Sequence, residues 1–148
     1  MNAGELLRLQ VQGTCVALDG IGVLLRGPSG AGKSHLALRL IEAGGVLVAD
    51  DLCEIRREGE RLVIDLPAVV DPNFRGKIER RGEGILSHPY FGPAPLGLVV
   101  DLRPSSAAEE LPETIEFLGL SRPLVVLDPF QPSTEAKLRS KVVQALVA

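Results

Sequence analysis

The chain has 148 residues, of which 45% are apolar and only 3% aromatic, and its net charge is −3. This length predicts a single domain, residues 1–148, with a core built from Leu, Val, Ile and Ala. The weak negative charge favours neither a nucleic-acid partner nor an anionic membrane surface, and no apolar stretch approaches the ~18 residues of a membrane span.

The start of the chain and its cysteines indicate a cytoplasmic protein. Residues 1–5 lack the basic and apolar regions of a secretory signal. Cys15 and Cys53 have no metal-binding or redox spacing and are too few for a disulfide framework. We therefore expect buried, inert thiols in a reducing compartment.

The first predicted elements form a hairpin. Two apolar runs, residues 14–18 and 21–25, flank the dipeptide Asp19-Gly20, a sequence typical of a tight β-turn. The strand at residues 21–25 therefore has an antiparallel neighbour immediately before it. Many small-molecule P-loop kinases instead begin directly with this strand in a parallel sheet.

The residues after this hairpin match the phosphate-binding pattern G-x-x-x-x-G-K-[ST]. They are Gly27, Pro28, Ser29, Gly30, Ala31, Gly32, Lys33 and Ser34. The glycines let several backbone N–H groups point inward at a helix N-terminus, where they bind an anion. Lys33 can reach the β- and γ-phosphates of a nucleotide, and the Ser34 hydroxyl can ligate Mg²⁺. The strand–loop–helix setting predicts that the chain binds a nucleotide or polyphosphate.

The remaining elements follow from apolar periodicity and from the turn residues. A helix over residues 33–43 stops at Gly44-Gly45, and residues 46–49 are a buried strand. Residues 54–57 and 61–64 suggest a second, more exposed hairpin, and a loop-rich middle follows. Residues 96–102 and 124–127 are two further strands, with a short helix expected in the polar segment between them. The last helix opens at residues 132–135, with Ser133 as its cap, and ends near residue 147.

Two carboxylates, Asp50 and Asp51, come directly after the buried strand at residues 46–49. This is where a magnesium-binding or water-positioning carboxylate belongs beside a phosphate loop. Since the two are adjacent, one can face the phosphates while the other is free to hold the loop.

A second charged cluster lies further along the chain. It consists of Arg75, Lys77, Glu79, Arg80 and Arg81. Its cations could hold a second phosphoryl group, and Glu79 could complete a metal shell with Ser34. Charge runs are usually solvated faces, so this cluster alone is a weak signal.

Taken together and in this order, the motifs resemble those of the HPr kinase/phosphorylase catalytic domain. The matching residues are Val48-Ala49-Asp50-Asp51 and Glu79-x-Arg81-Gly82-x-Gly84-Ile85, after the phosphate loop. The resemblance covers about residues 14–102 and is greatest to short forms without the N-terminal domain. It implies an α/β P-loop domain with a mixed central sheet, similar to PEP carboxykinase, in which the antiparallel hairpin precedes the phosphate loop.

The resemblance also implies an activity. The expected enzyme is a protein-serine kinase that transfers phosphoryl from ATP, with Mg²⁺, to a small HPr-like phosphocarrier of the phosphotransferase system, and also a phosphorylase. Lys33 and Arg81 would stabilise the phosphoryl group, and Asp50 would accept the serine proton. Ser34 and Glu79 would ligate Mg²⁺, and Asp51 would contact the metal or have a structural role. By family analogy the chain would form a homo-oligomer, a hexamer.

Three departures from the family pattern weaken the phosphorylase reading. Gln12 replaces a histidine, and an amide cannot shuttle a proton. His35 replaces an acidic residue after Ser34. The arginine loop that supports dephosphorylation has no clear counterpart, with Arg103 and Arg122 flanking its expected place. Two alternatives therefore stay open: a nucleotide-sensing regulatory module with little turnover, and a small-molecule P-loop kinase.

Overall fold

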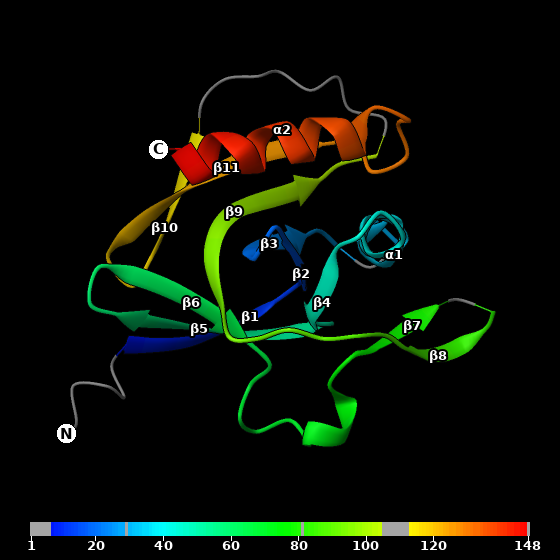
Figure 1. The fold of residues 1–148 in the computed structure, drawn as a ribbon, viewed down its shortest axis with the longest axis horizontal. Helices are drawn as coiled ribbons and strands as arrows, with labels where there is room; N and C mark the ends of the chain where they lie inside the picture. The colour runs from blue at the N-terminus through cyan, green and yellow to red at the C-terminus, as the bar shows by residue number, and fades with distance from the viewer. Residues whose placement is uncertain (1–6, 29, 81, 105–112, 148) are drawn as a thin grey trace.

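A mixed sheet of nine strands organises the described part of the chain (Figure 1). The computed structural model describes residues 7–28, 30–80, 82–104 and 113–147. The elements in chain order are β1 (Arg8–Gln12), β2 (Thr14–Leu18), β3 (Ile21–Arg26), α1 (Lys33–Glu42), β4 (Val46–Ala49), β5 (Leu52–Glu58), β6 (Arg61–Asp65), a 3-10 turn η2 (Pro72–Phe74), β7 (Lys77–Arg80), β8 (Gly84–Ser87), β9 (Ala94–Leu102), β10 (Glu113–Phe117), β11 (Leu120–Leu127) and α2 (Thr134–Val147). The sheet order is β1-β5-β6-β9-β3-β2-β4, with β11 on β9 and β10 on β11.

The hairpin before the phosphate loop is confirmed as β2 and β3. The two strands pair antiparallel from Thr14 opposite Leu25 to Leu18 opposite Ile21. Asp19 and Gly20 both have positive φ, at 52° and 79°. This is the backbone that a two-residue hairpin turn requires, and Asp-Gly adopts it readily. The turn therefore fixes the register of the strand that leads into the phosphate loop.

Strand β9 joins the two halves of the sheet. Its first residues pair antiparallel with β6, with Ala94 opposite Ile64. Its later residues pair parallel with β3 on one side and with β11 on the other. The sheet is therefore mixed, as predicted, and β3, β9 and β11 end at the same edge.

The curled sheet buries apolar side chains on both faces. On one face, residues of β2, β3 and β9 pack against Leu36 and Leu40 of α1 and Leu138 of α2. On the other face, Leu24 and Val99 pack with residues of β5 and β6, which fold over the sheet (Figure 1). Within the described ranges no helix is long and apolar enough to cross a bilayer.

The predicted second hairpin is present as β5 and β6, and it is more exposed than β2 and β3, as expected, although its central residues are buried. Ile55 and Ile64 are fully buried, and even Glu54 is 5% exposed. Glu54 reaches this position because β1 pairs with β5, which brings Arg8 within 3.4 Å of its carboxylate. Pairing with β1 on one edge and β9 on the other, together with the curl of the sheet, buries the central residues of the hairpin.

One further expectation is corrected, because the loop-rich middle contains an antiparallel hairpin, β7–β8, which projects beside α1 (Figure 1). The polar segment in which a short helix is expected contains the strand β10, which pairs with β11. Residues 105–112 of that segment lie outside the described ranges, so the helix stays a prediction. A β-strand at the edge of the sheet tolerates polar residues on its exposed face, so periodicity did not identify β10.

Candidate active site

The phosphate loop connects the end of β3 to the start of α1, as predicted. The loop is closed on itself by a hydrogen bond from Ala31 N–H to Pro28 O of 3.0 Å. Gly32 precedes the helix in the left-handed region, with φ of 98°, and gives the helix no side-chain cap. The first N–H groups of α1 are thus left to an anion rather than to a cap. Ser29 lies outside the described residues.

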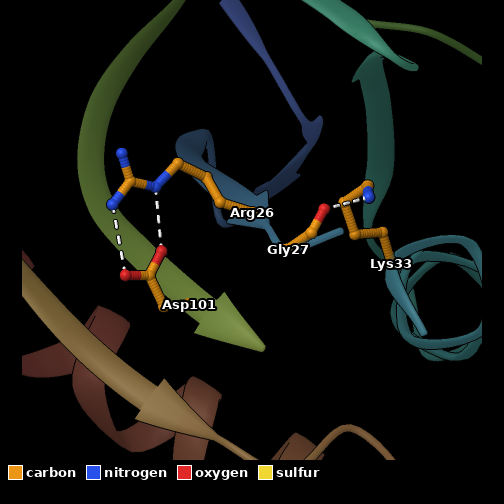
Figure 2. Close-up of polar contacts among 4 residues, drawn as sticks. All are labelled: Arg26, Gly27, Lys33 and Asp101. Carbon is orange, nitrogen blue, oxygen red and sulfur yellow. Dashed lines mark hydrogen bonds and ion pairs between the residues drawn. The ribbon is translucent and has the colours of Figure 1, made fainter. Parts of the chain in front are cut away.

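Lys33 bends back over this loop (Figure 2). Its ammonium group donates to Gly27 O and, at 3.3 Å, to Pro28 O. The charge is held by carbonyl oxygens of the loop itself, so it lies beside the backbone that is expected to bind phosphate. An ammonium in this position can neutralise phosphate oxygens.

Asp50 is directed into the fold, and Asp51 away from it. Asp50 Oδ1 accepts a hydrogen bond of 2.8 Å from the hydroxyl of Thr14, which is 1% exposed. Asp51 is exposed, and its backbone carbonyl accepts from Gly13 N–H at 3.1 Å. The two adjacent carboxylates therefore have different surroundings, and their roles stay a prediction.

The surroundings of Asp50 change its acidity. Burial raises the pKa of Asp50 above its ordinary value, and the charge of Asp51 raises it further. The Thr14 hydroxyl and a hydrogen bond from the backbone of Glu79 act in the opposite direction. Burial is the largest of these effects, so the net pKa is raised. A carboxylate with a raised pKa is a stronger base for accepting a proton.

The backbone of Glu79 hydrogen-bonds to Asp50, so the motif that begins at Glu79 lies beside this carboxylate. Ile78, its neighbour in β7, is 1% exposed and packs in the core beside α1. Because strand residues alternate in direction, Ile78 anchors β7 while the Glu79 side chain stays exposed. Asp50 and Glu79 are thereby brought together, although 29 positions separate them in the sequence (79 − 50). Arg81 lies outside the described residues.

The oxygen donors of the predicted metal set fit a hard cation such as Mg²⁺. They are a hydroxyl, from Ser34, and two exposed or partly exposed carboxylates, from Glu79 and Asp51. Within the described residues, no group of three or more His, Cys, Asp or Glu residues is arranged to hold a metal. Ser34, Glu79 and Asp51 would therefore fill only part of the coordination shell of Mg²⁺. Phosphate oxygens and water would fill the rest, as is usual for Mg²⁺ sites in kinases.

One ion pair at this edge was not predicted from the sequence. Arg26 is the last residue of β3, and Asp101 lies opposite it on β9. Arg26 Nε is 2.8 Å from Asp101 Oδ1, and Nη2 is 3.2 Å from Oδ2 (Figure 2). The bidentate pair ties together the ends of two parallel strands directly before the phosphate loop. The only signal in the sequence is that a charged residue lies at or near the end of each apolar run. This signal does not show that Arg26 and Asp101 pair with each other.

The remaining predicted positions have simple surroundings. Gln12 is exposed at the end of β1. Arg122 donates to two backbone oxygens, Leu96 O at 2.8 Å and Ser121 O at 2.7 Å. Cys15 and Cys53 are buried and not disulfide-bonded, as expected. Burial raises the pKa of Cys53 to about 12, so its thiol stays protonated and inert.

Comparison with known proteins identifies the family. A sequence model described as the HPr Serine kinase C-terminal domain matches residues 6–94, more than half of the chain. The chain belongs to this family. An HPr kinase/phosphorylase of Chlorobium limicola is 37% identical over 142 residues, which cover 84% of this chain and 41% of that protein. One of Caldicellulosiruptor bescii is 37% identical over 139 residues, covering 84% of this chain and 43% of that protein.

The family resemblance extends to the fold. The structure of the Hpr(Ser) kinase/phosphatase from Coxiella burnetii superposes with a TM-score of 0.78, covering 94% of this chain and 97% of that one, at 23% identity. The mixed α/β architecture predicted from the motifs is therefore confirmed. The chain spans less than half the length of the curated relatives named above.

Proposed function

We propose that the chain is an ATP-dependent protein-serine kinase that acts on a small HPr-like phosphocarrier protein. Membership of the HPr Serine kinase C-terminal domain family supports this activity. The observation that carries it is the position of Asp50, whose partly buried carboxyl lies between Thr14 and the backbone of Glu79. The Asp50 carboxylate, whose raised pKa makes it a stronger base, thus lies beside the family motif that begins at Glu79.

In the proposed reaction, Asp50 accepts the proton of a seryl hydroxyl as the serine oxygen forms a bond to the γ-phosphorus of ATP. The bond from that phosphorus to the β,γ-bridging oxygen breaks, and ADP leaves with the electron pair. Lys33 and Arg81 neutralise charge that develops on the transferring group and on the leaving oxygen. A bound Mg²⁺, held by Ser34 and Glu79 with Asp51 nearby, would supply further charge neutralisation.

The reverse reaction has weaker support. The guanidinium of Arg122 is bound to backbone carbonyls of its own sheet, so it does not resemble an arginine that is free to bind phosphate. Gln12 cannot carry a proton. Kinase activity is therefore proposed ahead of phosphorolysis, and a cytoplasmic homo-oligomer is part of the same proposal by analogy with the family.

Two variants test the proposal with the full chain. Lys33→Ala should abolish tight binding of ATP with Mg²⁺ in calorimetric titration while the protein stays folded, because Lys33 is not one of the buried core residues. Asp50→Asn should keep nucleotide binding and slow phosphoryl transfer by roughly 10²–10⁴-fold, the usual contribution of a positioned base. Transfer is measured with labelled ATP and a phosphocarrier, with phosphoserine mapped by mass spectrometry.

The same assay separates the alternatives. Tight ATP binding by wild type without transfer to any phosphocarrier would favour a nucleotide-sensing module. Gln12 in place of a histidine would agree with that outcome, because an amide cannot shuttle a proton. A larger kinetic loss in Asp51→Asn than in Asp50→Asn would mean that the two carboxylates have been assigned the wrong way round.

A further inference from the structure

The aromatic residues of this chain are used in an unusual way. The chain has four Phe and one Tyr, and all five are described. Only Phe117 is buried, at 7% exposed, whereas Phe130 is 51% exposed. Single exposed apolar side chains are common, so Phe130 is distinguished by its position and not by its exposure. Phe130 follows β11 and lies against His35 of α1, with their ring centroids 5.1 Å apart at an angle of 45°.

The backbone beneath Phe130 is held in place on several sides. Asp128, which is 7% exposed, accepts from Phe130 N–H at 2.9 Å and from the Gln131 side chain at 3.2 Å. The hydroxyl of Thr134, at the start of α2, donates to Asp128 O. Arg39, one turn along α1 from His35, donates to Pro129 O at 2.8 Å. A half-exposed ring on so constrained a loop loses little entropy when a ligand stacks on it.

This ring lies against the phosphate loop itself. A Cβ placed on Gly32 would come within 2.7 Å of Pro129 Cγ and 3.0 Å of Phe130 Cζ. Gly32 also has φ of 98°, which side chains rarely adopt. The last glycine of the phosphate loop is therefore required by contact with this Pro-Phe pair as well as by its own backbone. A nucleotide whose phosphates lie in the loop would have its remaining part within reach of Phe130.

The order of strands in the sheet indicates which way a bound nucleotide would lie across this edge. The phosphate loop follows β3, and Phe130 follows β11, which lies beyond β9 on one side of β3. Thr14 and Asp50 lie on β2 and at the end of β4, on the other side of β3. Ligands of such sheets bind at the carboxyl ends of the parallel strands, and β3, β9 and β11 share that edge. A nucleotide with its terminal phosphate toward Asp50 would thus extend its base toward Phe130.

We propose that Phe130, backed by His35, is the stacking surface for the base of the bound nucleoside triphosphate. This inference rests on the proposed nucleotide-dependent function and specifies one part of its binding site. Stacking on an aromatic ring is tolerant of base identity because every base presents a π-face. The surface therefore distinguishes a nucleotide from a bare polyphosphate and discriminates little between adenine and guanine.

The test compares ATP with inorganic tripolyphosphate, each with Mg²⁺, by calorimetric titration of the full chain. Phe130→Ala should weaken ATP binding by roughly tenfold to a hundredfold and leave tripolyphosphate binding unchanged, because only ATP has a base to stack. Phe130→Tyr retains the ring and should behave as wild type. Lys33→Ala should weaken both ligands, because it acts on the phosphates that they share.

Each other result has a defined meaning. If wild type binds both ligands and Phe130→Ala has the same effect on the two, or no effect, the stacking inference is overturned while nucleotide binding stands. If Phe130→Ala instead dissociates an oligomer in sedimentation experiments and ATP affinity is unchanged, Phe130 is a contact between copies of the chain, and the inference is also overturned. If wild type binds neither ligand, the proposed function itself is wrong.

Discussion

The hydroxyl of Thr14 donates a 2.8 Å hydrogen bond to Asp50 Oδ1, and this bond links the start of β2 to the residue that follows β4. Thr14 is 1% exposed, so the bond is shielded from water on the threonine side. Since the bond favours the ionised carboxylate, it partly offsets the rise in pKa that burial causes. Thr14 therefore adjusts the base strength of the proposed catalytic residue.

Thr14→Val should raise the pKa of Asp50 further, because it removes a donor while keeping the shape of the side chain. The carboxylate would then be lost at higher pH, so the acidic limb of the pH–rate profile for phosphoryl transfer should move to higher pH. Thr14→Ser keeps the hydroxyl and should leave the limb near its wild-type position. Superimposable profiles for Thr14→Val and wild type would show that Asp50 does not control this limb.

Asp50→Asn should make the protein more stable at neutral pH while it slows catalysis. Burial raises the folded-state pKa of Asp50 above that of the unfolded chain, so the folded state holds the proton more tightly. Stability therefore falls as pH rises from the unfolded pKa, about 3.9, through the folded pKa, and the full cost remains above it. The amide avoids this cost and can still accept from Thr14.

Thermal unfolding at neutral and acidic pH checks this expectation. The melting temperature of Asp50→Asn should exceed that of wild type at neutral pH, and the difference should shrink as acid protonates Asp50. Asp51→Asn, at an exposed position, is the matched control and should gain less. Equal melting temperatures for Asp50→Asn and wild type at neutral pH would contradict the raised pKa.

Magnesium titrations should separate the proposed metal ligands from Arg81, the arginine proposed to bind phosphate. Glu79→Gln and Ser34→Ala should both raise the Mg²⁺ concentration needed for half-maximal transfer, because each weakens an oxygen donor to the same cation. Arg81→Ala should lower turnover without moving that curve, since a guanidinium cannot ligate metal. If the Mg²⁺ curve of Glu79→Gln is identical to that of wild type, residues 79–85 are a solvated charged segment and not part of a metal site.

The Arg26–Asp101 pair should contribute to stability as a unit. Asp101→Leu leaves a partly buried guanidinium without its carboxylate, and we expect it to lower the free energy of unfolding by about 1–3 kcal/mol. Replacing both partners, in Arg26→Met with Asp101→Leu, should recover part of that loss because no unpaired charge remains. Urea unfolding of the two single variants and the double variant measures the coupling. Strictly additive losses would mean that the pair contributes no interaction of its own.

Local sequence patterns were sufficient for the elements around the phosphate loop. The Asp19-Gly20 turn, the apolar runs on either side and the stop at Gly44-Gly45 act over a few residues each, so β2, β3 and α1 could be predicted closely. The placement of Asp50 after a buried strand was predicted for the same reason.

Interactions between distant segments could not be predicted. The β7–β8 hairpin was taken for a loop because its sequence is rich in glycine and charge. Ile78 anchors the hairpin in the core. Gly76 allows its two ends to approach closely, because a Cβ at this position would come within 2.3 Å of His88 O. Thr14 and Asp101 were missed as parts of the site for a similar reason, since their partners depend on sheet register and not on spacing along the chain.

Strand β9 has a consequence for how the protein unfolds. Within nine residues it pairs with β6 of the curled hairpin and with β3 and β11 at the edge proposed to bind nucleotide. Loss of β9 would remove a partner from all three strands, so neither half of the sheet could open completely while the other kept its pairing. Amide protons on β3, β6 and β11 should therefore exchange through one shared opening, and the edge proposed to be catalytic shares the protection of the whole sheet.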